Sequence, residues 1–172
     1  MTPAQFVAAV DAFMDMKKRL IGADVSPTWQ AGRDPDQLRL KLPLELDGVQ
    51  HGQTLCIDAH PAYPTLRFYI MILFAPEGPS ICRLDYRLDD IHPNNADSLV
   101  KLPSMVCGPH YHAWRLNRHL AKSTAHALPL PNATPLPKIR QFDAALRWFC
   151  SENKIILPPG HRIELPAKER LL

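Results

Sequence analysis

The chain has 172 residues, of which 46% are hydrophobic, and this length and composition suit one folded domain with a hydrophobic core. Lysine and arginine number 20 against 17 aspartate and glutamate residues, and a net charge of +3 is too small to indicate a nucleic-acid-binding protein by itself. No apolar run reaches the roughly 18 residues that a membrane-spanning helix requires, and the N-terminus lacks a secretion signal. We therefore expect a single soluble, cytoplasmic domain over residues 1–172, with no membrane partner.

The cysteine and proline content limits the range of possible folds further. The four cysteines are scattered and form no C-x-x-C pair, so we expect reduced thiols, with Cys107 in the core. The chain has 18 prolines, about twice the usual share, and these must lie in loops and at strand ends because helix interiors exclude proline.

The first predicted element is a helix over residues 3–21. Thr2 and Gln5 fit a capping box at its start, and Gly22 offers a C-cap at its end. Apolar side chains recur along it at helical spacing: Phe6, Val10 and Phe13.

Four strands are predicted next. Leucines alternate with polar residues over 38–46, so every leucine lies on one face of a strand. A second strand covers residues 53–58, a third covers 65–74 and is apolar on both faces, and a fourth covers 81–88. Short connections predict an antiparallel meander, whose apolar face the first helix can cover.

In the remaining chain we predict a fifth strand that turns into a loop at residues 108–118 and a proline-rich crossing at residues 127–137. A closing helix at residues 137–152 and a tail at residues 153–172 follow. The meander then spans residues 25–118. The predicted fold class is α+β, with an N-terminal helix, an antiparallel sheet of five or six strands and a C-terminal helix.

Three short stretches carry the candidate site residues. Arg83 and Asp85 are two apart on a predicted strand and so share a face, as do His110 and His112. His92 lies in the His92-Pro93-Asn94-Asn95 stretch, which we expect to be a loop. If the fourth and fifth strands are neighbours, these side chains converge on one face of the sheet.

The chemistry of such a cluster is open. Two imidazoles on one strand face lie about 6 to 7 Å apart, which allows them to bind one metal ion or to act as acid and base on a phosphodiester. A metal ion would need further ligands, and His92 and Asp85 are the nearest candidates. In a metal-free site Arg83 would neutralise a phosphate. Solvated histidines and an ordinary Arg83–Asp85 charge pair are the alternatives without chemistry.

The ordered series Arg83-Leu84-Asp85, His92-Pro93-Asn94-Asn95 and G-P-H-Y-H-A-W from Gly108 resembles a family of small uncharacterised prokaryotic proteins. Their pattern is R-L-D … H-x-N … G-x-H-x-H, and they occur mostly in bacterial genomes and mobile elements, some beside toxin–antitoxin-like genes. The resemblance covers about residues 81–156. It implies that Arg83, Asp85, His92, His110 and His112 belong together, without assigning them a reaction.

Two function classes follow. The first is a toxin-type endoribonuclease that acts on RNA with a histidine-rich site. The second is a non-catalytic antitoxin, anti-defence or other regulatory module that binds a protein partner. Slight basicity favours the first class, and the absence of a basic cluster or an RNA-stacking motif favours the second. Cofactor, metal and oligomeric state are left undetermined.

Overall fold

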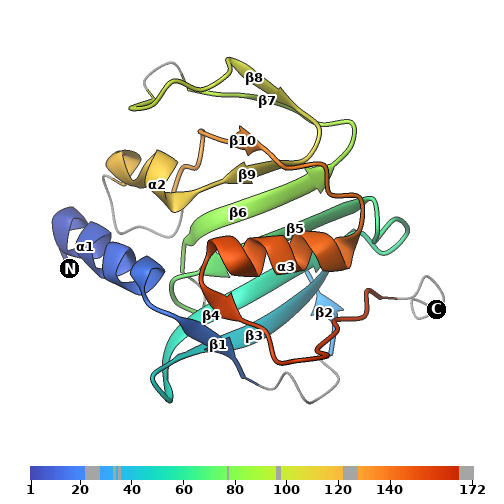
Figure 1. Ribbon diagram of the computed structural model, residues 1–172, viewed down its shortest axis with the longest axis horizontal. Coiled ribbons are helices and arrows are strands. Elements are labelled where there is room, and N and C mark those ends of the chain that lie inside the picture. Colours follow the sequence, from blue (N-terminus) through green and yellow to red (C-terminus); the bar gives the residue numbers. More distant parts are fainter. Residues whose placement is uncertain are drawn as a thin grey trace.

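The protein is described here by a computed structural model that covers residues 1–21, 28–32, 34, 36–76, 78–95, 98–121 and 128–166. It confirms the α+β class: a helix opens the chain, a large and mostly antiparallel sheet follows, and a helix comes near the end (Figure 1). No helix within these ranges is long and apolar enough to cross a membrane.

Helix α1 (Pro3–Asp15) begins as predicted and ends early. Thr2 and Gln5 form the capping box, with Thr2 Oγ1 accepting from the Gln5 amide at 3.2 Å and Gln5 Oε1 accepting from the Thr2 amide at 2.8 Å. The prediction of helix up to residue 21 is wrong, because Lys18–Leu20 forms strand β1, which pairs with β3 and with the distant β11. Strand pairing here overrides local helix periodicity. Gly22 lies outside the described residues.

The sheet has nine strands among the described residues, more than the five or six expected, in the order β10-β9-β6-β5-β4-β3-β1-β11 with β2 also pairing with β3. The predicted meander forms its centre, and of the strand pairs in the described ranges only β1–β11 is parallel. The nine strands of this sheet have the following bounds: β1 Lys18–Leu20, β2 Gln30–Ala31, β3 Leu38–Leu46, β4 Val49–Ala59, β5 Arg67–Leu73, β6 Ser80–Arg87, β9 His110–His112, β10 Thr134–Pro135 and β11 Ile155–Ile156.

One face of the sheet is covered by α3 (Phe142–Glu152), which lies across the strands in Figure 1. Its Phe142 ring meets Phe68 of β5 edge-on at 5.0 Å, and its Phe149 ring meets Tyr111 of β9 at 5.8 Å. The first helix does not take this central position. Helix α1 lies beside the strand ends (Figure 1), where Phe6 packs on Phe74 at 5.5 Å.

Two expectations at helical segments need correction. Helix α3 begins at Phe142 rather than at 137, since the preceding Gln141 has an extended backbone. The strand that starts at β9 does not run into a loop by residue 118 but turns into α2 (Trp114–Asn117) and the 3-10 turn η1 (Arg118–Leu120). Burial of Trp114, whose Nε1 donates to Asp11 Oδ1 at 2.8 Å, ties this turn to α1.

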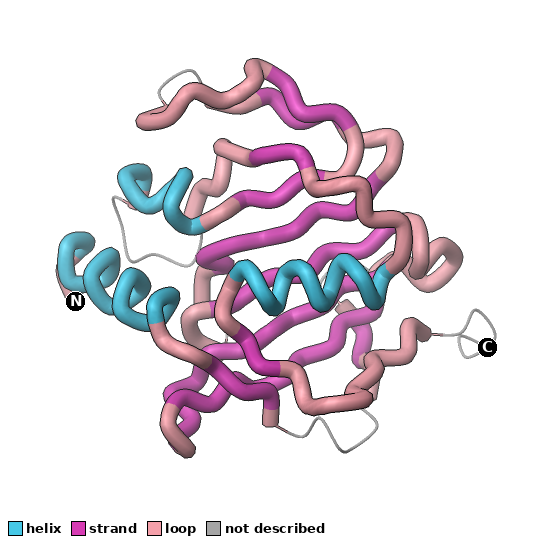
Figure 2. The backbone as a smooth tube through the Cα atoms, in the orientation of Figure 1, coloured by secondary structure: helices cyan, strands magenta, loops and turns pink. Residues whose placement is uncertain are grey.

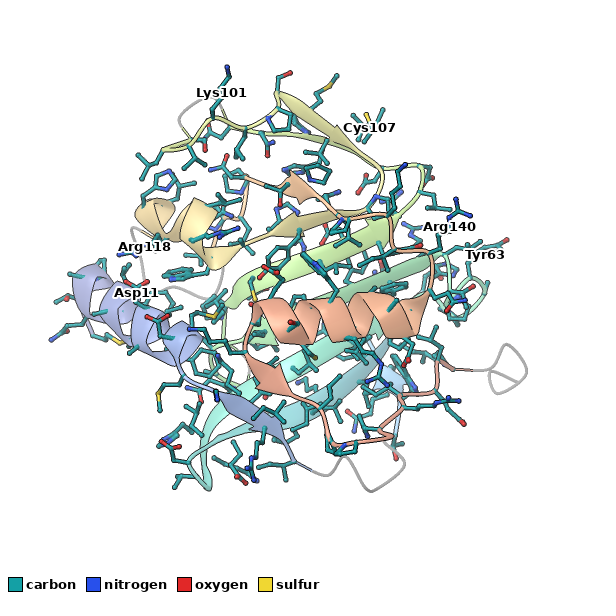
Figure 3. All side chains as sticks on the ribbon, in the orientation of Figure 1. Asp11, Tyr63, Lys101, Cys107, Arg118 and Arg140 are labelled. Atoms are coloured by element: carbon teal, nitrogen blue, oxygen red, sulfur yellow. The ribbon has the colours of Figure 1, made fainter. Side chains whose placement is uncertain are left out.

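Strands β7 (Ile91–Pro93) and β8 (Met105–Cys107) form a separate two-stranded hairpin where a loop was expected. It lies beyond β10 at one end of the molecule (Figure 2). His92 and Val106 face inward, whereas Ile91 and Met105 are exposed. Cys107 is exposed on the hairpin (Figure 3), so its predicted place in the core is wrong, although all four cysteines are free thiols as expected.

Candidate functional site

The pairing of β6 with β9 brings four of the five predicted residues onto one face. Arg83 lies opposite His112 and Asp85 lies opposite His110. Directly opposed residues of an antiparallel pair point to the same side, so these four side chains share the face away from α3. The convergence expected from the sequence had the neighbourhood of the two strands as its condition, and the structure meets that condition. Their pairing could not be read from the sequence, because both strands would also fit elsewhere in a sheet.

His92 reaches the same cluster from the hairpin. Its ring centroid lies 4.9 Å from that of His110 and 4.7 Å from that of His112, and the latter two are 4.9 Å apart. The hairpin is positioned by Asn94, whose Oδ1 accepts from the Ala133 amide at 2.6 Å while its Nδ2 donates to the Ala133 carbonyl at 3.0 Å. Three imidazoles from two different sheets therefore form a triangle.

Backbone carbonyls determine the tautomers of two of these imidazoles. His110 Nδ1 lies 2.9 Å from the Gly108 carbonyl oxygen, and His92 Nε2 lies 2.8 Å from the Pro131 carbonyl oxygen. A carbonyl oxygen only accepts, so each of these ring nitrogens must carry the hydrogen. In the neutral rings, His110 Nε2 and His92 Nδ1 are then lone pairs available to a ligand.

His112 is the least satisfied of the three. It is 0% exposed, and neither of its ring nitrogens makes a well-formed hydrogen bond with the described part of the chain. Its Nε2 lies 3.5 Å from Asp85 Oδ2, a long distance for a hydrogen bond. Burial lowers the pKa of His112 below its usual value, outweighing the opposite effect of Asp85. Buried polar atoms in proteins are nearly always hydrogen-bonded or bound to a ligand, so a neutral, buried imidazole with unpaired nitrogens indicates a binding position for a ligand or an ion.

Asp85 supplies the anion of the cluster. Arg83 Nε donates to Asp85 Oδ1 at 2.5 Å and Arg83 Nη2 donates to Oδ2 at 2.9 Å. Oδ2 also lies 3.7 Å from His110 Nε2. Burial favours the protonated acid, but the nearby His112 ring and the positive charge of Arg83 prevail and lower the pKa of Asp85 to about 2. The carboxylate is therefore ionised at neutral pH.

This donor set fits a transition metal ion. One ring nitrogen from each of His92, His110 and His112 lies within 4.8 Å of the other two. Nitrogen ligands around tetrahedral zinc are about 3.3 Å apart, given Zn–N bonds of about 2.0 Å, so modest side-chain rotations would close the set. Metal-bound imidazoles usually donate their other N–H to a carbonyl, as His92 and His110 do.

The acid–base alternative meets an obstacle in burial. His110 and His112 are 1% and 0% exposed, whereas an acid or base must touch its substrate. Arg83, in contrast, has 36% of its side chain exposed. A phosphodiester could reach the guanidinium but not the two buried imidazoles.

Sequence reasoning missed the residues that support the cluster. The carbonyls of Gly108 and Pro131 and the Asn94 side chain hold the imidazoles and the hairpin, and backbone carbonyls carry no sequence signal. Gly108 adopts a φ of +77°, a backbone conformation that favours glycine. Its carbonyl oxygen then lies within hydrogen-bond distance of His110 Nδ1. The sequence offered two hints: Asn94 stands in the His92-Pro93-Asn94-Asn95 stretch, and Gly108 is followed by Pro109.

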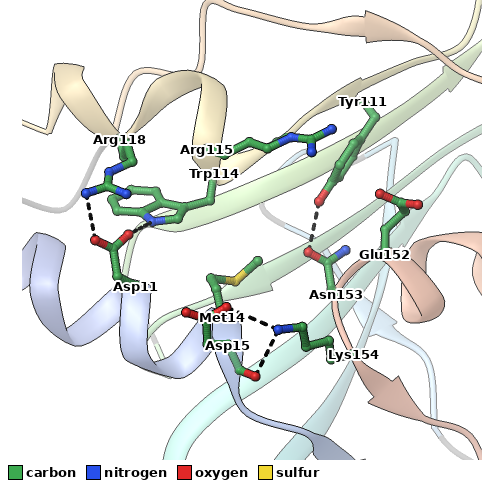
Figure 4. Close-up of a pocket in the computed structure, with 11 residues that line it drawn as sticks. Asp11, Met14, Asp15, Tyr111, Trp114, Arg115, Arg118, Glu152, Asn153 and Lys154 are labelled. Atoms are coloured by element: carbon green, nitrogen blue, oxygen red, sulfur yellow. Dashed lines mark hydrogen bonds and ion pairs between the residues drawn. The ribbon is translucent and has the colours of Figure 1, made fainter.

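A separate pocket of about 360 Å³ lies between α1, α2 and the end of α3 (Figure 4). It is lined by Asp11, Trp114, Arg118, Asn153 and Lys154 among others, and none of the five predicted residues lines it. In Figure 4 Asp11 is paired with Arg118 and with Trp114, and Asp15 with Lys154. Its charges are thus largely satisfied internally.

Comparisons with protein families, curated proteins and solved structures find no match to this chain. The resemblance to the small prokaryotic proteins with the G-x-H-x-H pattern therefore stays a prediction.

Proposed function

We propose that this chain is a metal-binding protein in which His92, His110 and His112 hold a zinc ion. The observation that carries the proposal is the state of the three rings, of which His110 and His112 are buried: two carbonyls fix the hydrogens of His92 and His110 on the far nitrogens, and His112 has no well-formed hydrogen bond among the described residues. Three lone pairs converge where a cation would satisfy all of them.

Zinc is the ion that this donor set favours. Imidazole nitrogen binds zinc, copper, nickel and iron, and an adjacent carboxylate is a common companion of histidine at zinc sites. None of the described cysteines lies in the cluster, which removes the thiolate ligands that would select copper(I) or an iron–sulfur cluster.

The proposal bears on both function classes. Burial of His110 and His112 supports a non-catalytic module over an endoribonuclease. Exposed apolar side chains on and near the hairpin give such a module a surface for a protein partner: Leu88, Ile91, Leu99, Val100 and Met105. The observation that favours the endoribonuclease is Arg83, whose partly exposed guanidinium lies beside the imidazoles and suits a phosphate.

Elemental analysis of the purified full chain tests the metal. We expect about one zinc per chain after dialysis, and loss of that zinc in His110→Ala and His112→Ala. His51→Ala is the matched control, because His51 is exposed on β4 away from the cluster. A wild-type chain that binds no zinc, cobalt or nickel would refute the proposal.

An assay on labelled RNA, with and without chelator, separates the two classes. We expect no cleavage in either condition. Cleavage that disappears in His112→Ala would instead support the endoribonuclease.

A further inference from the structure

We infer that Asp85 is a positioning residue of the zinc site: it does not bind the ion, but it accepts the hydrogen of His112 Nε2 and so turns the Nδ1 lone pair of His112 toward the ion. The inference rests on the proposed function, since it concerns the same ion. It gives the carboxylate a role and names the nitrogen through which His112 binds.

Asp85 lies outside the group of atoms that can share this ion. Two sets of three side chains in the described ranges bring one ligand atom each to within 4.8 Å of the other two: His92, His110 and His112, and Asp85, Asp90 and His110. Asp85 and His112 do not occur together in either set. The carboxylate therefore lies beside the three-histidine site and not in it.

The same distances identify the nitrogen that His112 offers. His110 can bind only through Nε2, because its Nδ1 donates to the Gly108 carbonyl. Asp85 Oδ2 lies 3.7 Å from His110 Nε2 and 3.5 Å from His112 Nε2. If the two Nε2 atoms lay within 4.8 Å of each other, these three residues would form a further set of possible ligands, and they do not. His112 therefore faces the ion with Nδ1.

Asp85 stabilises the tautomer that this geometry requires. A neutral imidazole has one N–H, and an ionised carboxylate only accepts. Neither ring nitrogen of His112 has another partner in the described part of the chain, so the hydrogen is favoured on Nε2, which faces Asp85 Oδ2. The separation of 3.5 Å is long for a hydrogen bond, and a small rotation of the ring as Nδ1 binds the ion would shorten it.

All three imidazoles then have an acceptor on the side away from the ion. The acceptors are the Pro131 carbonyl for His92, the Gly108 carbonyl for His110 and the Asp85 carboxylate for His112. Such outer partners fix the tautomer of a ligating histidine and raise the basicity of its metal-binding nitrogen. Only the partner of His112 carries a full negative charge, so His112 gains the most as a ligand.

Arg83 holds Asp85 in the orientation that this role needs. Arg83 Nε donates to Asp85 Oδ1 at 2.5 Å and Arg83 Nη2 donates to Oδ2 at 2.9 Å, which fixes the plane of the carboxylate. Each carboxylate oxygen has a second lone-pair position, and the one on Oδ2 remains for His112. Asp85 is 5% exposed, so little water can replace the imidazole as a donor.

Nitrogen-15 NMR of the imidazole rings tests the inference on the wild-type chain. Long-range proton–nitrogen correlation spectra at about pH 8, where free imidazoles are neutral, distinguish a ring nitrogen that carries hydrogen from one that does not. We expect the hydrogen of His112 on Nε2 in the metal-free chain, and we expect it to stay there when zinc binds Nδ1. The His112 signals are assigned by their absence from His112→Leu.

Asp85→Asn measures what the carboxylate contributes. The amide is uncharged and presents a donor as well as an acceptor, so it no longer favours hydrogen on Nε2. We expect zinc affinity to fall by about 10- to 100-fold and the two tautomers of His112 to mix. Asp58→Asn is the matched control and should change neither quantity, because Asp58 is a buried carboxylate on the same face of the sheet that Arg39 holds with the same two-pronged hydrogen bonding.

The possible outcomes separate the two proposals. No zinc binding by the wild type refutes the proposed function and this inference with it. Zinc bound through His112 Nε2, or a metal-free His112 with its hydrogen on Nδ1, overturns the inference and leaves the three-histidine site standing. So does an Asp85→Asn chain with wild-type affinity and tautomer. The wild-type spectra decide the matter even if Asp85→Asn does not fold.

Discussion

His92 stacks on His110 although the two residues belong to different sheets, with ring centroids 4.9 Å apart and ring planes inclined by 24°. The hydrogen bonds on the far sides of the two rings, to Pro131 and Gly108, orient the remaining nitrogens toward the shared space. The stack is thus one link between the hairpin and the sheet, beside the contacts of Asn94 and Asn95 with residues 132 and 133.

Replacement of His112 should abolish zinc binding without destabilising the metal-free fold. We expect His112→Leu to change the unfolding free energy of the metal-free chain by no more than about 1 kcal/mol, because the substitution removes buried nitrogens that lack good partners. Zinc at about 100 times its Kd should stabilise the wild type by about 2.7 kcal/mol and leave His112→Leu unaffected. Denaturant unfolding with and without zinc measures both quantities. An equal zinc effect in the two proteins would contradict the prediction.

Loss of the Asn94 amide should loosen the hairpin. Its side chain bonds both the amide and the carbonyl of Ala133 and donates to the Pro103 carbonyl at 2.7 Å. We expect Asn94→Ala to speed hydrogen exchange in β7 and β8 and to weaken zinc binding by about 10-fold, because His92 is no longer held over its partners. Ile91→Ala, on the exposed outer side of the same strand, is the control and should change neither.

Lys18 should make stability rise with pH above neutrality. Its side chain is fully buried, and its Nζ donates to three backbone carbonyls, of Met14, Met16 and Asn153. Burial lowers the pKa of Lys18 from 10.5 to about 8. Between these two values the unfolded chain binds a proton that the folded chain does not, so the folded state gains stability as pH rises.

This gain approaches about 3 kcal/mol across the window, at about 1.4 kcal/mol per pH unit. It is measured as the difference in unfolding free energy between wild type and Lys18→Met from pH 7 to 10.5, which cancels the other titrating groups. Lys17→Met, at the exposed neighbouring position, should show no such trend. A flat difference for Lys18→Met would mean that its amine keeps its proton throughout.

Asn153 joins the closing helix to the sheet through a buried polar network. Its Oδ1 accepts from the Tyr111 hydroxyl at 2.8 Å (Figure 4) and from the Cys82 thiol at 3.3 Å, and its Nδ2 donates to the Phe149 carbonyl. We expect Asn153→Ala to cost about 2–4 kcal/mol, because it strands two buried donors, and Tyr111→Phe to cost only about 1 kcal/mol. Equal costs in chemical denaturation would show that the hydroxyl bond dominates the network.

Several features of this protein follow from local periodicity and were predictable from the amino-acid sequence. The alternating leucines define β3 to the residue, the capping box marks the start of α1, and spacing by two places Arg83 with Asp85 and His110 with His112 on shared strand faces. These features follow from the geometry of a single strand or helix, which a few adjacent residues specify.

Other features depend on partners distant in the chain, and they arise only when the chain folds. Helix α1 gives way to β1 because Lys18 and Arg19 pair with Ile155 and Ile156, and no local pattern announces a partner so far along the chain. The neighbourhood of β6 and β9, the hairpin that delivers His92, and the burial that leaves His112 without good partners likewise arise only when the sheet assembles. Strand pairing and burial are long-range properties, so the sequence could propose the five residues of the cluster, while the folded chain alone sets the distances between them.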